Sequence, residues 1–502
     1  MNKKTVLCAL ALLMVYTSCA PAQQYDNEAD FRVALLDDGK SVEITEYVGE
    51  RQTVNIPPRI EGLTVTRIGD RAFREKKIIR ITIPNSVTAI GDGAFAGNPF
   101  INITLPKSVT SIGNAAFSRC DSLTSITIPT GVTSIGEYAF SGCTSLASIT
   151  IPAGVTSVGK YAFSGCTKLT SITIPASVTS IGDGAFQDCT NLTVNFASGS
   201  KLVSIGERAF FSCTSLTSIT IPTSVTSIGD GAFSRCTSLT RITIPASITE
   251  INDIYFGIFL GCTSLTRIIV DGKNPNYSSE GGILYNKTKT KLIAFPSASG
   301  NVTIPASVTT IGSSAFNECI SLTSITIPLS VTEISGEAFS GCTSLTSIAV
   351  STNNPNYLSE GGILYNKTKT KLITFPSASG TITIPASVTS IGEWAFASCT
   401  GLTRVTIPTS VTSIGDGAFA SCTSLTSVTI PASVTSIGNA AFVNCTSLTS
   451  VTIPASVTSV GEDAFSDWTV EQTINIAGST SGWHMFWGFG CEAKIVYQGG
   501  NG

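Results

Sequence analysis

The sequence contains one histidine, three methionines and four tryptophans among 502 residues, and only 13% of the residues are charged. With 42% hydrophobic residues, the chain is too apolar and too weakly charged to remain disordered. Its formal net charge of −3 provides no overall attraction to nucleic acid or to anionic lipid. The high apolar content and the small net charge therefore predict an ordered chain with no nucleic-acid partner.

Catalytic motifs are also missing. The chain has no Walker phosphate loop, no His-Glu-x-x-His and no Gly-x-Ser-x-Gly, and no serine recurs beside a base. The single histidine, His484, lies among Trp483, Phe486 and Trp487, where packing explains it better than catalysis. Catalysis needs a few unlike groups that converge on one point. We therefore expect no enzyme activity, no cofactor and no metal site.

The first residues have the pattern of an export leader. A positively charged start precedes an apolar run, Val6 to Val15, that is too short to span a bilayer. The following Thr-Ser-Cys, which ends at Cys19, resembles a bacterial lipobox, although Tyr16 stands where a branched residue is usual. Ordinary cleavage after Ala20 or Ala22 is the alternative.

Both interpretations predict export. With a lipobox, residues 1–18 are a lipoprotein signal peptide, Cys19 carries the lipid, and residues 19–30 form a short linker. The expected location is then the outer membrane or cell surface, with contact to the membrane only through the lipid anchor. A secreted or periplasmic protein is the alternative. No later stretch is apolar enough for a membrane helix.

One short pattern recurs through most of the chain. Fifteen phenylalanines occupy the same place in it, and most are 23 residues apart. In one unit, Ile219 and Ile221 share a strand face, Pro222 ends the strand, and Gly229 permits a bend before Phe233. One unit cannot bury its own apolar side chains, whereas stacked units can. The repeat therefore predicts a solenoid.

The unit reads L-x-x-I-x-I-P-x-x-V-x-x-I-G-x-x-A-F-x-x-C and resembles the BspA-like, Treponema-type class of bacterial surface leucine-rich repeats. The match covers roughly residues 31–497. The resemblance implies a β-rich α/β fold, a curved leucine-rich-repeat solenoid of about 23-residue coils. A parallel β-sheet is expected along one side, with short irregular or helical turns on the other.

Departures from the repeat predict the domain organisation. We expect an N-terminal capping hairpin at 31–66, the solenoid at 67–466 and a C-terminal cap at 467–502. Two gaps of 57 residues between successive repeat phenylalanines mark inserts at 270–301 and 350–381. The inserts are near copies of one another, and each is expected to form a β-hairpin.

Twelve of the fifteen cysteines fall three residues after a repeat phenylalanine, from Cys120 to Cys445. Equivalent side chains on stacked coils point in parallel, whereas a disulfide needs converging Cβ vectors. We expect a ladder of free buried thiols, with scattered disulfides as the alternative. No Cys-x-x-Cys pair or nearby histidine favours metal binding. The Gly-Asp-Gly at 182–184 lacks the context of a calcium-binding roll.

Three surfaces are candidates for ligand binding. The first is the exposed strand position between the two inward aliphatic residues, where threonines form an uncharged row of hydroxyl groups. Weak contacts repeated along this row would add up through avidity, although threonine also simply suits an exposed strand position. The candidate residues are Thr127, Thr150, Thr173, Thr220 and Thr243.

The second candidate surface is the pair of insert turns, where lysines crowd together. They could meet an anionic glycan or an acidic protein, and a solvated hairpin tip is the alternative. The tyrosines of the inserts are better explained by packing than by ligand contact. The candidate residues are Lys287, Lys289 and Lys291 in the first insert and Lys367, Lys369 and Lys371 in the second.

A third, weaker candidate is the variable pair of residues before each Ala-Phe. It varies between coils while the core does not, which is consistent with recognition but better explained by drift at a solvated edge. Examples are Glu137-Tyr138, Lys160-Tyr161, Glu207-Arg208 and Glu393-Trp394.

The resemblance implies a surface-exposed adhesion or protein-interaction role. It implies binding to host extracellular-matrix or cell-surface proteins or glycans, attachment to cells, and coaggregation with other bacteria. The alternatives are a structural envelope or periplasmic coat protein without a specific ligand, and an enzyme subunit that uses the solenoid as a clamp.

Overall fold

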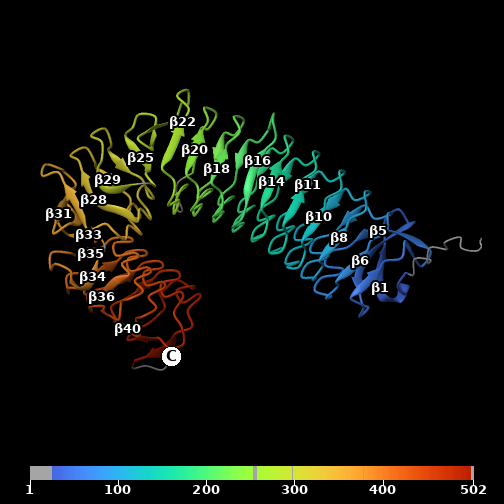
Figure 1. The fold of residues 1–502 in the computed structure, drawn as a ribbon. Helices are drawn as coiled ribbons and strands as arrows, with labels where there is room; N and C mark the ends of the chain where they lie inside the picture. The colour runs from blue at the N-terminus through green and yellow to red at the C-terminus, as the bar shows by residue number, and fades with distance from the viewer. Residues whose placement is uncertain (1–24, 253–256, 297, 377, 499–502) are drawn as a thin grey trace, which may run out of the picture.

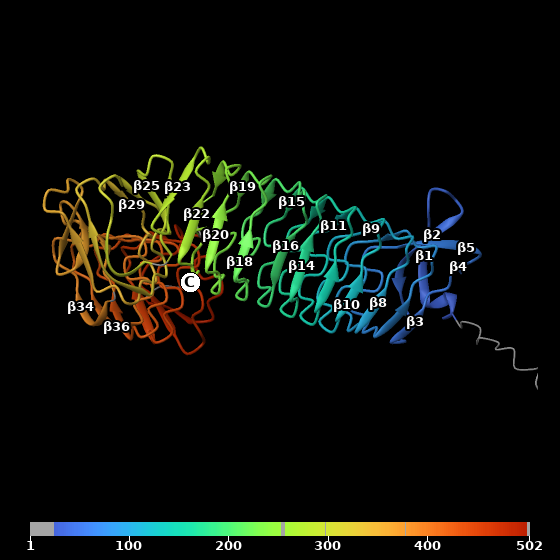
Figure 2. The same cartoon turned by 45° about the horizontal axis from the view of Figure 1, so that its top comes forward.

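The structure is a computed structural model that describes residues 25–252, 257–296, 298–376 and 378–498. The expected signal peptide and Cys19 lie outside these residues, so both remain predictions. Figure 1 shows the coils following one another along a wide arc from the N-terminal to the C-terminal end, and Figure 2 shows the same arc turned by 45°. The predicted curved solenoid with parallel strands is confirmed.

Each regular coil adds one strand to a first parallel sheet, which contains the expected Ile-x-Ile positions. Strands of successive coils pair in register, so that Ile126 lies beside Ile149. Its strands are β3 (Thr53–Asn55), β6 (Arg80–Thr82), β8 (Asn102–Thr104), β10 (Ser125–Thr127), β12 (Ser148–Thr150), β14 (Ser171–Ile174), β16 (Thr193–Phe196), β18 (Ser218–Thr220), β20 (Arg241–Ile244), β22 (Arg267–Val270), β26 (Ser299–Thr303), β28 (Ser321–Ile327), β30 (Ser347–Val350), β34 (Ser379–Thr383), β36 (Gly401–Thr406), β38 (Ser427–Thr429), β40 (Ser450–Ile453), β42 (Thr473–Ile476) and β43 (Lys494–Tyr497).

A second parallel sheet, which the sequence analysis did not predict, is built mostly from two-residue strands before the repeat glycine. In β15, Ser180 is exposed in part and Ile181 is buried, so the short Ser-Ile pair already alternates outward and inward. Its strands are β2 (Ser41–Tyr47), β5 (Leu63–Ile68), β7 (Ala89–Ile90), β9 (Ser111–Ile112), β11 (Ser134–Ile135), β13 (Ser157–Val158), β15 (Ser180–Ile181), β17 (Ser204–Ile205), β19 (Ser227–Ile228), β21 (Glu250–Ile251), β25 (Lys291–Ala294), β27 (Thr310–Ile311), β29 (Glu333–Ile334), β33 (Lys371–Thr374), β35 (Ser390–Ile391), β37 (Ser413–Ile414), β39 (Ser436–Ile437) and β41 (Ser459–Val460).

The third side of each coil is an irregular turn. The only helix among the described residues is one 3₁₀ turn, η1 (Glu28–Asp30), at the N-terminal end. The residue before most Ala-Phe pairs adopts a left-handed backbone, as at Tyr161 (φ 52°) and Gly184 (φ 57°). The last glycine of Gly-Asp-Gly therefore serves the turn, because glycine adopts positive φ without steric cost. Its Asp183 accepts a hydrogen bond from the backbone N–H of Glu207 in the next coil (3.0 Å).

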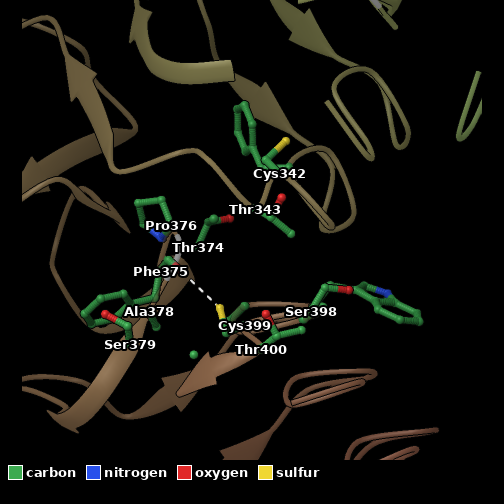
Figure 3. A pocket seen from close by; sticks show the side chains of 15 residues that line it. Cys342, Thr343, Thr374, Phe375, Pro376, Ala378, Ser379, Ser398, Cys399 and Thr400 are labelled. Carbon is green, nitrogen blue, oxygen red and sulfur yellow. Dashed lines mark hydrogen bonds between the residues drawn. The ribbon is translucent and has the colours of Figure 1, made fainter. Parts of the chain in front are cut away.

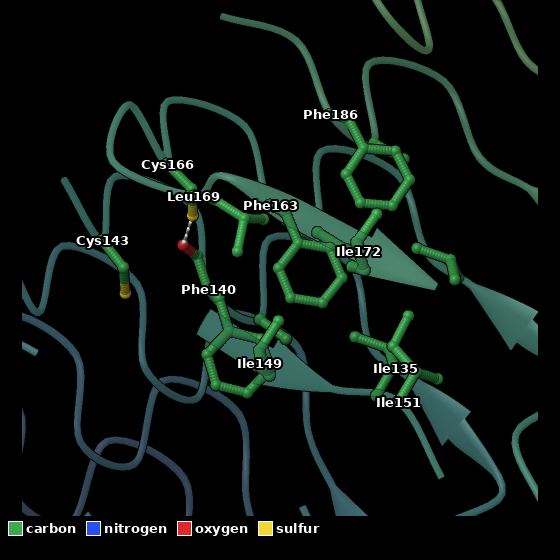
Figure 4. Close-up of a cluster of buried hydrophobic side chains, with 14 of the residues drawn as sticks. Ile135, Phe140, Cys143, Ile149, Ile151, Phe163, Cys166, Leu169, Ile172 and Phe186 are labelled. Carbon is green, nitrogen blue, oxygen red and sulfur yellow. Dashed lines mark hydrogen bonds between the residues drawn. The ribbon is translucent and has the colours of Figure 1, made fainter. Parts of the chain in front are cut away.

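The repeat phenylalanines stack along the inside of the solenoid. Phe163 lies between Phe140 and Phe186 with ring centroids 5.4 Å away on both sides and interplanar angles of 5° and 4°. Figure 4 shows these three rings together with the isoleucines of the first sheet. All three side chains are fully buried. Within each uninterrupted run of regular coils, the phenylalanines thus form one register inside the core, as the repeat predicted.

Each of the twelve repeat cysteines is buried and free, and its thiol donates a hydrogen bond to a phenylalanine carbonyl of the coil before. Cys166, for example, donates to Phe140 (3.2 Å; Figure 4). At the two ends of the series, Asn98 and Trp468 replace cysteine and donate to the equivalent carbonyls of Phe73 and Phe442. The position therefore requires a buried donor, and cysteine supplies one with a small side chain.

Among the cysteines that the structure describes, thiol alkylation of the native protein should be confined almost entirely to Cys491. Burial raises the pKa of the Cys120 and Cys189 thiols to about 12, so little reactive thiolate is present at pH 8. Cys491 is only half-buried, although burial raises its pKa as well. Peptide mapping after a short iodoacetamide pulse would measure this. Equal labelling of Cys189 and Cys491 in the folded protein would contradict the buried ladder.

Each insert begins with an antiparallel pair and continues with the predicted hairpin. In the first insert, β23 (Tyr277–Glu280) pairs with β24 (Ile283–Asn286), which pairs through the lysine turn with β25. β25 then joins the second sheet by parallel pairing with β27. The second insert repeats this arrangement with β31 (Tyr357–Glu360), β32 (Ile363–Asn366) and β33.

The inserts also build coils of their own. Phe295 donates its backbone N–H to Ala315 and accepts the thiol of Cys319, as a repeat phenylalanine does. Phe375 occupies the same place in the second insert and stacks on Phe396 (5.4 Å). The buried apolar side chains form three clusters, and the boundaries between them fall at the two inserts. The inserts therefore join three stacks of coils.

Both ends of the stack are covered. At the N-terminal end, β1 (Phe31–Leu35) pairs antiparallel with β2, while the short β4 (Arg59–Ile60) pairs with β5. Tyr47 begins the ring ladder, 5.5 Å from Phe73. At the C-terminal end, the fully buried Trp468 packs edge-on against Phe465 (5.2 Å). These large side chains cover coils that would otherwise expose apolar surface.

Candidate functional site

The predicted threonine row lies on the outer face of the first sheet. Parallel register places Thr127 beside Thr150 on β10 and β12, and Thr220 beside Thr243 on β18 and β20. The inward isoleucines between them fill the core, so the threonine side chains point outward and are exposed. The fifth candidate, Thr173, is also exposed and lies beside Asn195 of β16.

The row is interrupted where β16 ends one run of the first sheet and β18 begins the next. The coil there is longer by one residue, and a shallow groove of about 470 Å³ opens between the two strands. Its lining contains Thr193, Asn195, Thr217 and the candidate residue Thr220. The structure thus places one predicted threonine in a groove and the others on a flat face.

The six candidate lysines divide into two groups. In the first insert, Lys287 donates its ammonium group to the backbone carbonyl of Asn274, and Lys289 pairs with Glu280 (2.6 Å). The Lys289 ammonium lowers the pKa of the Glu280 carboxyl by hydrogen bonding and charge. Lys367 and Lys369 repeat these contacts with Asn354 and Glu360 in the second insert (2.6 Å each). These four lysines therefore stabilise the hairpins that carry them.

Lys291 and Lys371 form the second group. Both are exposed at the start of β25 and β33, and within the described residues neither forms an ion pair. A lysine with no internal partner keeps its charge available for a ligand. The sequence pattern does not show that these two lysines lack a partner, because that depends on which lysines face Asn274 and Glu280 in the folded hairpin.

The Asn-Pro-Asn-Tyr motif of each insert is structural. The fully buried Asn274 side chain donates to the carbonyls of Pro245 and Ile248 (2.9 Å each) and accepts from the backbone N–H of Tyr277. The Tyr277 hydroxyl accepts from the N–H of Ile251 (2.9 Å). The expectation that the insert tyrosines pack against a coil is confirmed for this residue.

A groove of about 680 Å³ lies between the second insert and its neighbouring coils. Lys371 and Lys367 line it from the hairpin, and Asn356 and Tyr357 line it from the motif before β31. Glu393, one residue of a variable pair, lines it from the next coil. The lining therefore combines two ammonium groups, a carboxylate and neutral donors and acceptors, a composition suited to a polar or acidic surface.

The variable pairs lie along the turn edge. Tyr138 and Tyr161 stack on one another there (5.1 Å, interplanar angle 14°), and Tyr138 remains largely exposed. Lys160, which forms a variable pair with Tyr161, makes an ion pair with Asp183 (2.9 Å). The edge is thus partly ordered by its own contacts, which favours the structural explanation for these residues.

The described part of the chain lacks the side-chain clusters of a metal site and the helix of a membrane span. It contains no group of three or more histidine, cysteine, aspartate or glutamate side chains placed to hold a metal ion. No helix there has the length and apolarity that a membrane crossing requires. His484 is exposed in the C-terminal cap, where its ring lies 5.8 Å from that of Phe486.

Comparison with protein families identifies the repeat. The family model described as the BspA type leucine rich repeat region, six copies, matches residues 66–193, 193–299, 296–382 and 379–484. These matches cover well over half of the chain. No curated protein matches it.

Solved structures of bacterial proteins share the repeat over most of the chain. A leucine rich cell surface protein from Faecalibacterium prausnitzii is 28% identical, with 91% of this chain and 96% of that chain covered and a TM-score of 0.44. A leucine-rich repeat protein from Bacteroides ovatus is 26% identical, with 94% and 100% covered and a TM-score of 0.40.

Proposed function

The chain belongs to the BspA-type leucine-rich-repeat family, and from this premise we propose that it is a bacterial surface adhesin that binds other molecules without chemistry of its own. Leucine-rich-repeat proteins generally bind other proteins, and this family is typically surface-exposed. The proposed partners are host extracellular-matrix or cell-surface proteins or glycans, and other bacteria. Lipid attachment at Cys19 would hold the protein on the outer membrane.

The groove at the second insert is the observation that carries the proposal. The groove presents the Lys371 ammonium group, which forms no ion pair within the described residues, beside Tyr357 and Glu393. Lys367 also lines the groove, while its ammonium group donates to the Asn354 carbonyl and stabilises the hairpin. The uncharged threonine row offers a second, weaker contact area along the same molecule. Many weak contacts on a rigid array suit a repetitive or extended partner.

Reversing the charge of Lys371 should weaken binding to an acidic matrix protein. For Lys371→Glu we expect about a tenfold higher dissociation constant for immobilised fibronectin at low salt, and a smaller difference at high salt because exposed charges are screened. Surface plasmon resonance over a salt series measures this. Lys494→Glu, an equal charge change at an exposed residue of β43, is the matched control. Equal losses in both variants would reject the groove.

A structural coat protein without a specific ligand is the competing function. It requires no exposure to the outside of the cell, whereas adhesion does. Protease added to intact cells should therefore cleave the protein if it is an adhesin. Complete protection on intact cells, with cleavage after lysis, would favour the periplasmic coat.

A further inference from the structure

The two inserts meet their preceding coils in different ways, although they are near copies of one another. At the second junction, a cavity of about 180 Å³ separates the coil of Phe339 from the coil that contains Phe375. At the first junction, the equivalent space between Phe259 and Ile293 is only about 10 Å³. The same backbone insertion thus leaves one junction filled and the other open.

Two residues that follow each insert account for part of the difference. At the first junction, Asn317 lines the small space, and Glu318 reaches back over Gly261 so closely that a Cβ on this glycine would lie 2.5 Å from its carboxylate. The corresponding residues of the second junction, 80 positions later, are Ala397 and Ser398. Both line the open cavity, and both side chains are too short to fill it.

The cavity has an aromatic part. Phe339 stacks on Phe316 (5.5 Å) and Phe375 stacks on Phe396 (5.4 Å), but within the described residues Phe339 and Phe375 form no stacked pair. Within runs of regular coils, successive phenylalanine rings stack on one another across the equivalent space. The nearly buried Phe339 and the partly buried Phe375 both line the cavity, so they give it an apolar, aromatic part.

The remaining lining is uncharged and combines hydroxyl and thiol side chains with apolar residues, among them Trp394 and Pro376. No aspartate, glutamate, lysine, arginine or histidine lines the cavity. Figure 3 shows Cys342 and Thr343 on one side of it and Cys399 and Thr400 on the other. The hydroxyl groups of the lining belong to Thr343, Thr374, Ser379, Ser398 and Thr400.

We propose that this junction cavity, formed by Phe339, Phe375 and the five surrounding hydroxyl residues, binds a single neutral sugar residue. A sugar ring offers hydroxyl groups that exchange hydrogen bonds with serine and threonine, and a C–H face that packs against an aromatic ring. A charged ligand would lose its hydration without meeting an opposite charge. The cavity is concave and small, which limits it to one ring. The proposal does not depend on adhesion through the lysine groove.

The test uses the full chain and methyl glycosides of glucose, galactose, mannose and N-acetylglucosamine. Saturation-transfer difference NMR should show binding of at least one of them. In the variant Ala397→Asn/Ser398→Glu, which copies the filled first junction, the dissociation constant should rise at least about tenfold. The variant is expected to fold, because the same residues already occupy the same place in the first junction.

The reverse exchange, Asn317→Ala/Glu318→Ser, should open the first junction and raise the number of sugar sites from one to two. Binding of none of the four glycosides, or unchanged binding in the filled variant, would overturn the proposal. Tighter binding of methyl glucuronide, or of phenol, would overturn it as well, because the site would then select charge or an aromatic ring. Circular dichroism of both variants verifies that any loss is not unfolding.

Discussion

Replacing Phe163 with alanine should lower the free energy of unfolding by about 3–5 kcal/mol, the usual cost of emptying a packed aromatic site. The side chain is fully buried, and its ring contacts the rings of Phe140 and Phe186 at 5.4 Å on both sides. The backbone cannot collapse into the space, because turns of adjacent coils are joined by hydrogen bonds such as Phe163 N–H to Ala185 (2.8 Å). The cavity would therefore persist.

Urea denaturation measures the loss, and hydrogen-exchange mass spectrometry locates it. Repeat arrays lose structure coil by coil, so protection should fall in the coil of Phe163 and its two neighbours first. Tyr138→Ala is the matched control, since Tyr138 also stacks on an aromatic ring but is largely exposed. It should cost no more than about 1 kcal/mol. Equal effects of the two substitutions would contradict a ladder buried inside the solenoid.

The regular coils could be predicted from the sequence because each position of the repeat has the same surroundings in every coil. Phe163, Cys166 and Ile172 each recur at a fixed spacing, and a side chain that recurs on every coil must stack on its own equivalent. The parallel register of Ile126 and Ile149 follows directly. The exposure of Thr127 follows as well, because strand side chains alternate between the two faces.

What could not be predicted depends on contacts between different parts of the repeat. Phe295 lies outside the 23-residue spacing, so its place in the ring ladder appears only through its bonds to Ala315 and Cys319. The unlike surroundings of Lys287 and Lys291 result from the fold of the hairpin on the Asn274 loop. The junction cavity depends on two side chains that lie far from the insert pattern in sequence. Each feature arises where the repeat is broken.

The glycine that follows each Ser-Ile pair of the second sheet is closely confined by the backbone of the coil before it. A Cβ on Gly182 would lie 2.7 Å from the backbone of Gly159 and Lys160. The position carries a side chain in the coils immediately before the two inserts, at Asn252 and Ser335. The bond from Ser335 N–H to Ile311 is 3.2 Å, compared with 2.8 Å from Gly182 N–H to Val158. At Ser335, a side chain at this position therefore accompanies a longer bond to the coil before it and an interruption of the core.

Gly182→Ala should lower the free energy of unfolding by about 1–3 kcal/mol, the cost of forcing an extra methyl group into a packed site. The atoms it would meet are backbone, so only separation of the two coils can relieve the contact. Gly154→Ala is the control, because its Cβ would make only ordinary contacts, with Thr130 O at 3.5 Å and Val132 O at 3.7 Å, and it should change stability by less than about 0.5 kcal/mol. Urea denaturation of both variants compares them, with hydrogen exchange expected to increase on both sides of residue 182. If Gly182→Ala were as stable as Gly154→Ala, close approach of the coils would not explain the glycine, and the longer bond at Ser335 would need another cause.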